Sequence, residues 1–191
     1  MLLAKALQAI SKRYCDINSA RRELQTISGE ATRAAKQAIF ALQREDQSRA
    51  RALLKQALGL LIQGQRCVTR EPRLATEGMW RAALEETCEA VLCDRVVSNV
   101  SLLPVPAVIH EPEILIGGIA DLVGEMVRLA IRAATHGESA RVTHLHALAE
   151  QLVEWLTSMD IIGPLRAKGD QARQHLRKLE DIRYDLAQRA R

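Results

Sequence analysis

Apolar side chains recur at every third or fourth position along nearly the whole chain, which is the spacing of one face of an α-helix. The first such stretch spans residues 2–43 without a proline, and only Ser28 and Gly29 favour a break in it. Further helices are predicted at residues 46–65, 74–100, 111–134, 139–158 and from 164 almost to the C-terminus. No segment alternates apolar and polar residues as a half-buried β-strand does. The periodicity therefore predicts an all-α bundle of long helices.

The composition agrees with a helical protein. The chain of 191 residues contains one Phe, two Trp and two Tyr, too few aromatic residues for a typical β-sandwich or barrel. Its length suits a single domain covering residues 1–191. An excess of 27 Lys and Arg over 23 Asp and Glu permits binding to a polyanion. Four scattered cysteines without a C-x-x-C pair, no signal peptide and no apolar run of about 20 residues predict a soluble, cytoplasmic protein without membrane association.

Such long helices in one subunit bury only part of their apolar surface within it. We expect the first and last helices to project from the bundle with exposed leucines. Because large exposed apolar surfaces are usually covered by partners, the sequence predicts an oligomer.

Two pairs of carboxylates lie at helical spacing within otherwise apolar stripes. Glu86 and Glu89 are three residues apart in the third predicted helix, and Asp121 and Glu125 are four apart in the fourth. Residues at these spacings share one helix face, so two such helices packed together would gather four acids at one place. An unpaired acidic cluster of this kind is costly unless it binds a hard cation, holds protons or lies in water.

A solvated or salt-bridged helix face is the alternative interpretation of these acids. The residues one turn from the glutamates are small or apolar and carry no positive charge, and Gly117 and Gly118 lie beside Asp121. Only Arg128, three residues after Glu125, is placed for an intrahelical ion pair. Small neighbours let helices approach closely, which suits a metal site better than an exposed face.

Four segments resemble the translin and Trax proteins over nearly the full length of the chain. Residues 86–91 are similar to the Glu-x-x-Glu-Ala-Val stretch of the acidic Trax helix, and residues 118–128 resemble the Trax pattern Gly-Val-Ala-Asp-Leu-Thr-Gly-Glu-Leu-Met-Arg. Residues 176–186 are similar to the closing helix of the family, which ends in Tyr-Asp-Leu, and residues 38–44 match part of the first Trax helix. The acids place the chain on the Trax side of this resemblance.

The resemblance implies a bundle of six to seven antiparallel helices that assembles into a hollow octamer. It also implies cleavage of single-stranded RNA inside the shell, with Mg²⁺ or Mn²⁺ bound by acids. We expect Glu86, Glu89 and Asp121 to be metal ligands, and Glu125 to be a fourth ligand or the group that orients the attacking water. Single-stranded DNA is a second candidate ligand. Whether a separate translin-like partner subunit is needed stays open.

Candidate nucleic-acid-binding residues lie close to these acids in the sequence. Trp80 and Arg81 precede the glutamates and resemble a Trp-Arg pair of the translin binding segment, so Trp80 is a candidate for base stacking and Arg81 for phosphate contact. Arg128 and Arg132 are further candidates for holding phosphates, and Arg73 adds basic charge nearby. The alternatives are that Trp80 anchors the core and that Arg128 pairs with Glu125.

Two other functions compete with the nuclease. The first is a non-catalytic, translin-like protein that binds single-stranded RNA or DNA, which the four acids weigh against. The second is a ferritin-like di-metal oxidase, which requires Glu-x-x-His on two helices. Glu86 is followed at that spacing by Glu89, and Asp121 by Gly124, so this second alternative is disfavoured.

Overall fold

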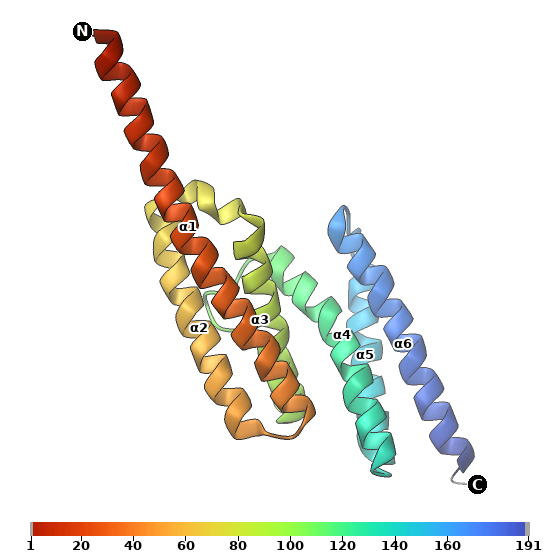
Figure 1. Ribbon diagram of the computed structural model, residues 1–191. Helices are drawn as coiled ribbons and strands as arrows, with labels where there is room; N and C mark the ends of the chain where they lie inside the picture. The colour runs from red at the N-terminus through yellow and green to blue at the C-terminus, as the bar shows by residue number, and fades with distance from the viewer. Residues whose placement is uncertain (1, 190–191) are drawn as a thin grey trace.

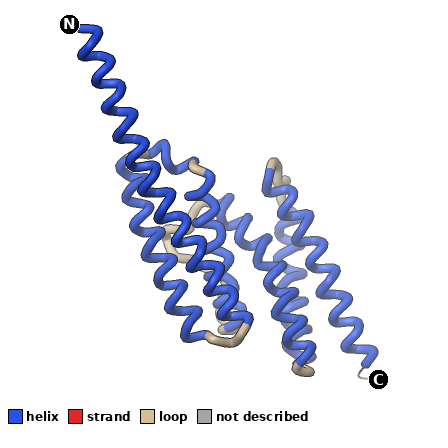
Figure 2. The backbone as a smooth tube through the Cα atoms, in the orientation of Figure 1, coloured by secondary structure: helices blue, strands red, loops and turns tan. Residues whose placement is uncertain are grey.

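The computed structural model describes residues 2–189, and within that range it contains helices and no strand (Figure 2). This confirms the predicted all-α class. The structure has six α-helices and one 3₁₀ helix: α1 (Leu2–Gln43), α2 (Gln47–Arg70), η1 (Pro72–Thr76), α3 (Gly78–Val97), α4 (Pro112–Thr135), α5 (Ser139–Ser158) and α6 (Pro164–Arg189).

The helices form two groups of three that meet along α3 and α4. Helices α1, α2 and α3 pack on one another, α4 packs on α5 and α6, and the contact between α3 and α4 joins the groups (Figure 1). The loop between α3 and α4 spans residues 98–111 and is the longest connection between the described helices. Residues from both sides of the α3–α4 junction therefore meet although this loop separates them in sequence.

The predicted helix bounds differ from the structure mainly around Gly64. Helix α1 continues without a break through Gly29, and α2 extends past Gly64 to Arg70. A Cβ atom at Gly64 would lie 2.5 Å from Cζ3 of Trp80, so this glycine permits close packing and does not end the helix. Pro72 then lies in the first turn of η1. As a result, α3 begins at Gly78, later than the sequence pattern indicated.

The N-terminal part of α1 projects beyond the rest of the molecule (Figure 1). It carries an apolar stripe in which Leu3, Leu7, Ile10 and Tyr14 are each more than half exposed. The prediction of a projecting first helix is thus confirmed. The same prediction for the last helix is wrong, because α6 packs on α4 and α5 and buries Leu179. No helix within residues 2–189 combines the length and the apolar character required to cross a bilayer.

The junction of α3 and α4 depends on a glycine. A Cβ atom at Gly118 would lie 2.7 Å from Sγ and 2.9 Å from Cβ of Cys88, closer than such atoms normally approach. This confirms that the small residues beside the acids let the two helices approach closely. The acids of both helices are brought together by this contact.

Replacing Gly118 by Ala should lower the free energy of unfolding by about 1–3 kcal/mol, because the extra methyl group forces α3 and α4 apart. Chemical denaturation would measure the change. Gly59→Ala is the matched control, since a Cβ atom at this exposed helical position has open space around it. That control should stabilise the protein by about 0.5–1 kcal/mol through helix propensity. Equal effects of the two variants would contradict a close contact at Gly118.

Candidate active site

Three of the four predicted acids line one pocket. Glu86 and Glu89 of α3 and Glu125 of α4 form one side of it, and the pocket has a volume of about 330 Å³. The remaining lining residues come from α1 and from the next turn of α4: Lys36, Ile39, Phe40, Gln43 and Arg128. Asp121 lies one helical turn before Glu125 and does not line the pocket. The two helices therefore bring three of the four acids to one pocket, whereas the predicted gathering of all four at one place is not observed.

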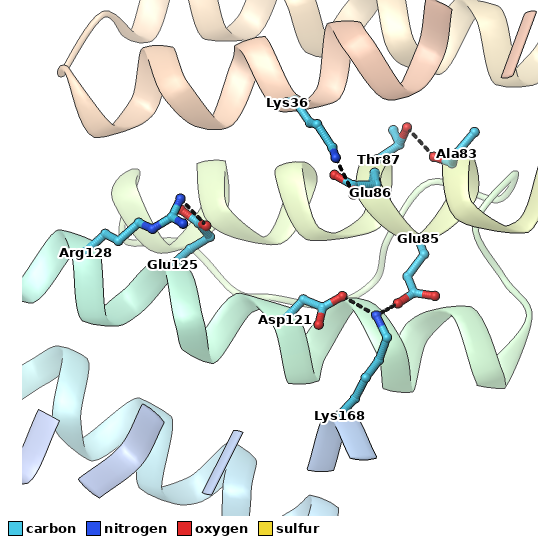
Figure 3. A network of polar contacts seen from close by, with 9 residues as sticks. All are labelled: Lys36, Ala83, Glu85, Glu86, Thr87, Asp121, Glu125, Arg128 and Lys168. Carbon is cyan, nitrogen blue, oxygen red and sulfur yellow. Dashed lines mark hydrogen bonds and ion pairs between the residues drawn. The ribbon is translucent and has the colours of Figure 1, made fainter. Parts of the chain in front are cut away.

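Most of these acids have cationic partners, contrary to the sequence-based expectation. Lys36 Nζ lies 3.2 Å from Glu86 Oε1, and Arg128 Nη1 lies 3.0 Å from Glu125 Oε1 (Figure 3). Gln43 also donates a hydrogen bond to Glu125. Only the Arg128 pair lies within one helix, and it confirms the alternative noted from sequence. Lys36 comes from α1, so the spacing within α3 could not reveal it.

Asp121 belongs to a second group of charges on the side of α6. Lys168 of α6 donates hydrogen bonds to Asp121 Oδ2, at 2.5 Å, and to Glu85 of α3 (Figure 3). Gly117 makes room for this contact, because a Cβ atom there would lie 2.7 Å from Cδ of Glu85. Neither Glu85 nor Lys168 was predicted from the sequence as a site residue. The paired glycines at 117 and 118 were the only local signal that a side chain of another helix approaches here.

Among the four predicted acids, Glu89 has the most strongly raised pKa. Its pKa is raised to about 8, first by burial and then by the negative charges of Asp121, Glu125 and Glu86. Among the ion pairs of residues 2–189, none involves Glu89. Burial also raises the pKa of Glu125, although Arg128 and Gln43 oppose that shift. Glu89 is thus a carboxyl group that holds a proton near neutral pH unless another positive charge arrives.

The donor set suits a hard divalent cation in its chemistry. Carboxylate oxygens are the ligands preferred by Mg²⁺ and Mn²⁺, and a dication would relieve the repulsion that raises the pKa of Glu89. As the side chains of residues 2–189 lie, however, no three His, Cys, Asp or Glu groups are near enough to one another to surround an ion. Lys168, Lys36 and Arg128 supply the neutralising charges in this arrangement.

Lys168→Met should lower the free energy of unfolding by about 1–3 kcal/mol, because Glu85 and Asp121 would face each other without the ammonium group between them. Thermal or chemical denaturation at neutral pH would measure the loss. Lys178→Met, an exposed position on the same helix, serves as the control and should change stability by less than about 0.5 kcal/mol. Equal stability of the two variants would show that Lys168 does not hold the acids together.

The structure separates the predicted nucleic-acid-binding residues from one another. Trp80 is only 1% exposed and packs against Gly64, so it anchors the core and cannot stack on a base. The prediction of a binding role for Trp80 is therefore wrong, and the core alternative is confirmed. Arg81 pairs with Glu111 at 2.9 Å and with Glu113, which ties the start of α3 to that of α4.

The remaining arginines differ in how free they are to contact RNA. Arg132 donates to the backbone oxygen of Gln43 at 2.8 Å and pairs with Glu45 at 3.1 Å, so it joins α4 to the end of α1. Arg73 pairs with Glu71 at 3.4 Å but its side chain is 71% exposed. Arg128 lines the acidic pocket and is 64% exposed. Of the arginines named from sequence, Arg128 alone lies at the acids.

Comparisons with solved structures show where this fold occurs. Apo-NeC3PO superposes with a TM-score of 0.84 at 18% identity, covering 94% of this chain and 96% of that one. Two structures of AfC3PO, one of them a complex with duplex RNA, each give a TM-score of 0.84 at 21% identity and cover 95% of this chain. The aligned region covers 96% of the AfC3PO chain in the RNA complex and 97% of the chain in the other AfC3PO structure. At these identities the likeness establishes the fold alone.

Sequence comparison gives the family directly. No curated protein sequence matches the chain significantly. The sequence model of the translin family, in contrast, matches residues 19–190, which is most of the chain. This protein is therefore a member of the translin family.

Proposed function

We propose that this protein is a metal-dependent endoribonuclease that hydrolyses phosphodiester bonds of single-stranded RNA. The observation that carries the proposal is Glu89, a carboxyl group whose pKa is raised to about 8 at the wall of a pocket it shares with Glu86 and Glu125. Strongly perturbed carboxyl groups in a pocket are typical of catalytic sites. A purely structural acid would normally be paired with a cation or exposed to water.

Glu86, Glu89, Asp121 and Glu125 are the residues that would hold Mg²⁺ or Mn²⁺. When bound, such an ion supplies positive charge to the phosphodiester transition state and activates water. Glu89 Oε atoms can hold or release a proton close to neutral pH, as a general acid or base requires. Lys36 and Arg128 lie at the pocket with more than half of each side chain exposed, so both can contact phosphate oxygens.

A solved structure with a similar fold supports RNA as the ligand. One of the similar structures is AfC3PO in a complex with duplex RNA. Our preference for single strands comes from the resemblance of the acidic motifs to Trax, so both RNA forms belong in the test. Single-stranded DNA is the second candidate polyanion, and the net charge of +4 is compatible with either.

The proposed assembly is a homo-octamer that encloses the acidic pockets. The exposed stripe of Leu3, Leu7, Ile10 and Tyr14 on the projecting part of α1 requires a partner surface, which a second copy of the chain would supply. We therefore expect light scattering at micromolar concentration to give a mass about eight times the 21.2 kDa of the chain. A stable monomer under these conditions would contradict the proposal. If a translin-like partner subunit is required, the chain should assemble only after it is mixed with that subunit.

The decisive experiment incubates the purified protein with labelled single-stranded RNA, with duplex RNA and with single-stranded DNA. Each reaction is run with Mg²⁺, with Mn²⁺ and with EDTA. We expect internal cleavage of single-stranded RNA that requires the metal and is stopped by EDTA.

A non-catalytic RNA-binding protein is the second candidate. It is favoured by one observation, namely that Lys36, Arg128 and Lys168 already neutralise three of the four acids. Binding of RNA without cleavage in every metal would establish this candidate in place of the nuclease.

A further inference from the structure

An aromatic residue lines the acidic pocket, although it is neither part of the buried core nor paired with one of the acids. Phe40 of α1 lines the same pocket as Glu86, Glu89 and Glu125, and it is 52% exposed. It is the only phenylalanine of the chain. One exposed apolar side chain is ordinary on a protein surface, so exposure alone gives no function to Phe40. Its position beside the acids is what requires an explanation.

One face of the Phe40 ring is already occupied by a cation. The guanidinium carbon of Arg44, which lies in the turn directly after α1, is 4.1 Å from the centroid of the ring. This distance is typical of a cation–π contact, which holds the ring in one orientation. Despite this contact, Phe40 stays more than half exposed and lines the pocket.

The pocket that Phe40 lines contains positive charges as well as acids. Lys36 lies one helical turn before Phe40 on α1, and Arg128 lines the same pocket from α4. Their ion pairs with Glu86 and Glu125 appear in Figure 3, and the two side chains are 62% and 64% exposed. Arg44 lies over the ring, and Lys36 and Arg128 add two further cations to the pocket that the ring lines. A ligand that combines a flat aromatic group with negative charge fits this surface.

We propose that Phe40 and Arg44 form a stacking platform for one unpaired nucleobase of an RNA strand whose adjoining phosphate lies at Lys36 and Arg128. The inference rests on the proposed function and names the subsite that positions the substrate. Aromatic side chains and arginine planes stack on bases of any identity, because every base has a π face. A base within a duplex is already stacked on both sides, so this subsite selects single strands.

A second copy of the chain is the competing occupant of Phe40. The long apolar stripe of α1 lies at the opposite end of the helix, on residues 3–14, whereas Phe40 is close to the C-terminal end. The surroundings of Phe40 are charged, and a subunit interface is typically depleted in charged residues at its centre. Charge complementarity therefore favours the polyanion over a second copy.

The test measures RNA binding in a Glu89→Gln background, so that cleavage does not interfere. Fluorescence anisotropy compares a labelled single-stranded oligoadenylate with a chain of the same length made of abasic ribose phosphates. We expect Phe40→Leu to weaken binding of the oligoadenylate by about five- to a hundredfold, the range for the loss of one base–aromatic stack. Binding of the abasic chain should not change, and Phe40→Trp should retain the affinity for oligoadenylate.

Tyr184→Leu is the matched control, because Tyr184 is an exposed aromatic residue of α6 that does not line the acidic pocket. It should bind both probes as the background protein does. Equal binding by Phe40→Leu and the background would overturn the platform and leave the proposed nuclease intact. The same holds for an equal loss with both probes, and for dissociation of the assembly by Phe40→Leu in light scattering, which would assign Phe40 to an interface. Absence of RNA binding by the unmodified protein would overturn the proposed function as well.

Discussion

Replacing Glu89 by Gln should reduce RNA cleavage by more than about a hundredfold while leaving RNA binding and assembly nearly unchanged. Even residues that only orient metal ligands contribute about 10- to 100-fold to affinity or activity, so the loss of a ligand should exceed that. Gln has nearly the same size as Glu but cannot ionise, and Glu89 is paired with no cation among the ion pairs of the described residues. The fold should therefore tolerate the change. Single-turnover cleavage of labelled RNA would measure it.

The control is Glu150→Gln, which alters an exposed carboxylate of α5 remote from the acidic pocket in sequence and absent from its lining. It should cleave RNA at the rate of the unmodified protein. Asp121→Asn should resemble Glu89→Gln, because the negative charge of Asp121 acts on Glu89 and the residue is a proposed ligand. Full activity in both site variants would mean that the acids form a structural charge network.

The helices were predictable because their signals are local. The 3.6-residue pattern located α1 and α5 within a residue or two of their observed ends. The second helix was predicted to end at residue 65, next to Gly64, but this glycine serves a contact with Trp80, which lies sixteen positions away on another helix. A glycine that ends a helix and one that admits a neighbouring ring look the same in the sequence.

The site was predictable only in part for the same physical reason. Glu86 and Glu89 share one helix face, as do Asp121 and Glu125, because their spacing alone determines this in any α-helix. The counter-charges of Glu86 and Asp121 come from other helices and depend on how the helices pack. Lys168 is 47 residues from Asp121 and 83 from Glu85, and no pattern within either helix reveals that contact. The charge balance of the site, and with it the distinct state of Glu89, required the structure.

Without divalent metal, the free energy of unfolding should fall as the pH rises from about 4.5 to about 8 because of Glu89. The carboxyl group has an ordinary pKa of 4.5 in the unfolded chain and a pKa of about 8 in the folded one. Between these values the folded state keeps a proton that the unfolded state has lost, so each increase in pH favours unfolding. One such group contributes up to about 1.4 kcal/mol per pH unit. Below the lower pKa both states are protonated and the effect vanishes.

Comparison with Glu89→Gln reports this contribution, because the two proteins carry the same other ionisable side chains and Gln resembles the protonated form of Glu89. The two proteins should be nearly equal in stability at pH 4.5 or below, and the Gln variant should become progressively the more stable of the two as the pH approaches 8. Denaturant titrations in EDTA at several pH values would measure the difference. Added Mn²⁺ should stabilise the unmodified protein most at the higher pH, where binding no longer competes with the proton, and should stabilise the variant less. If the free energy of unfolding depends on pH in the same way in both proteins, Glu89 is ionised in the folded state and its charge is balanced there. That result would remove the observation on which the nuclease proposal depends.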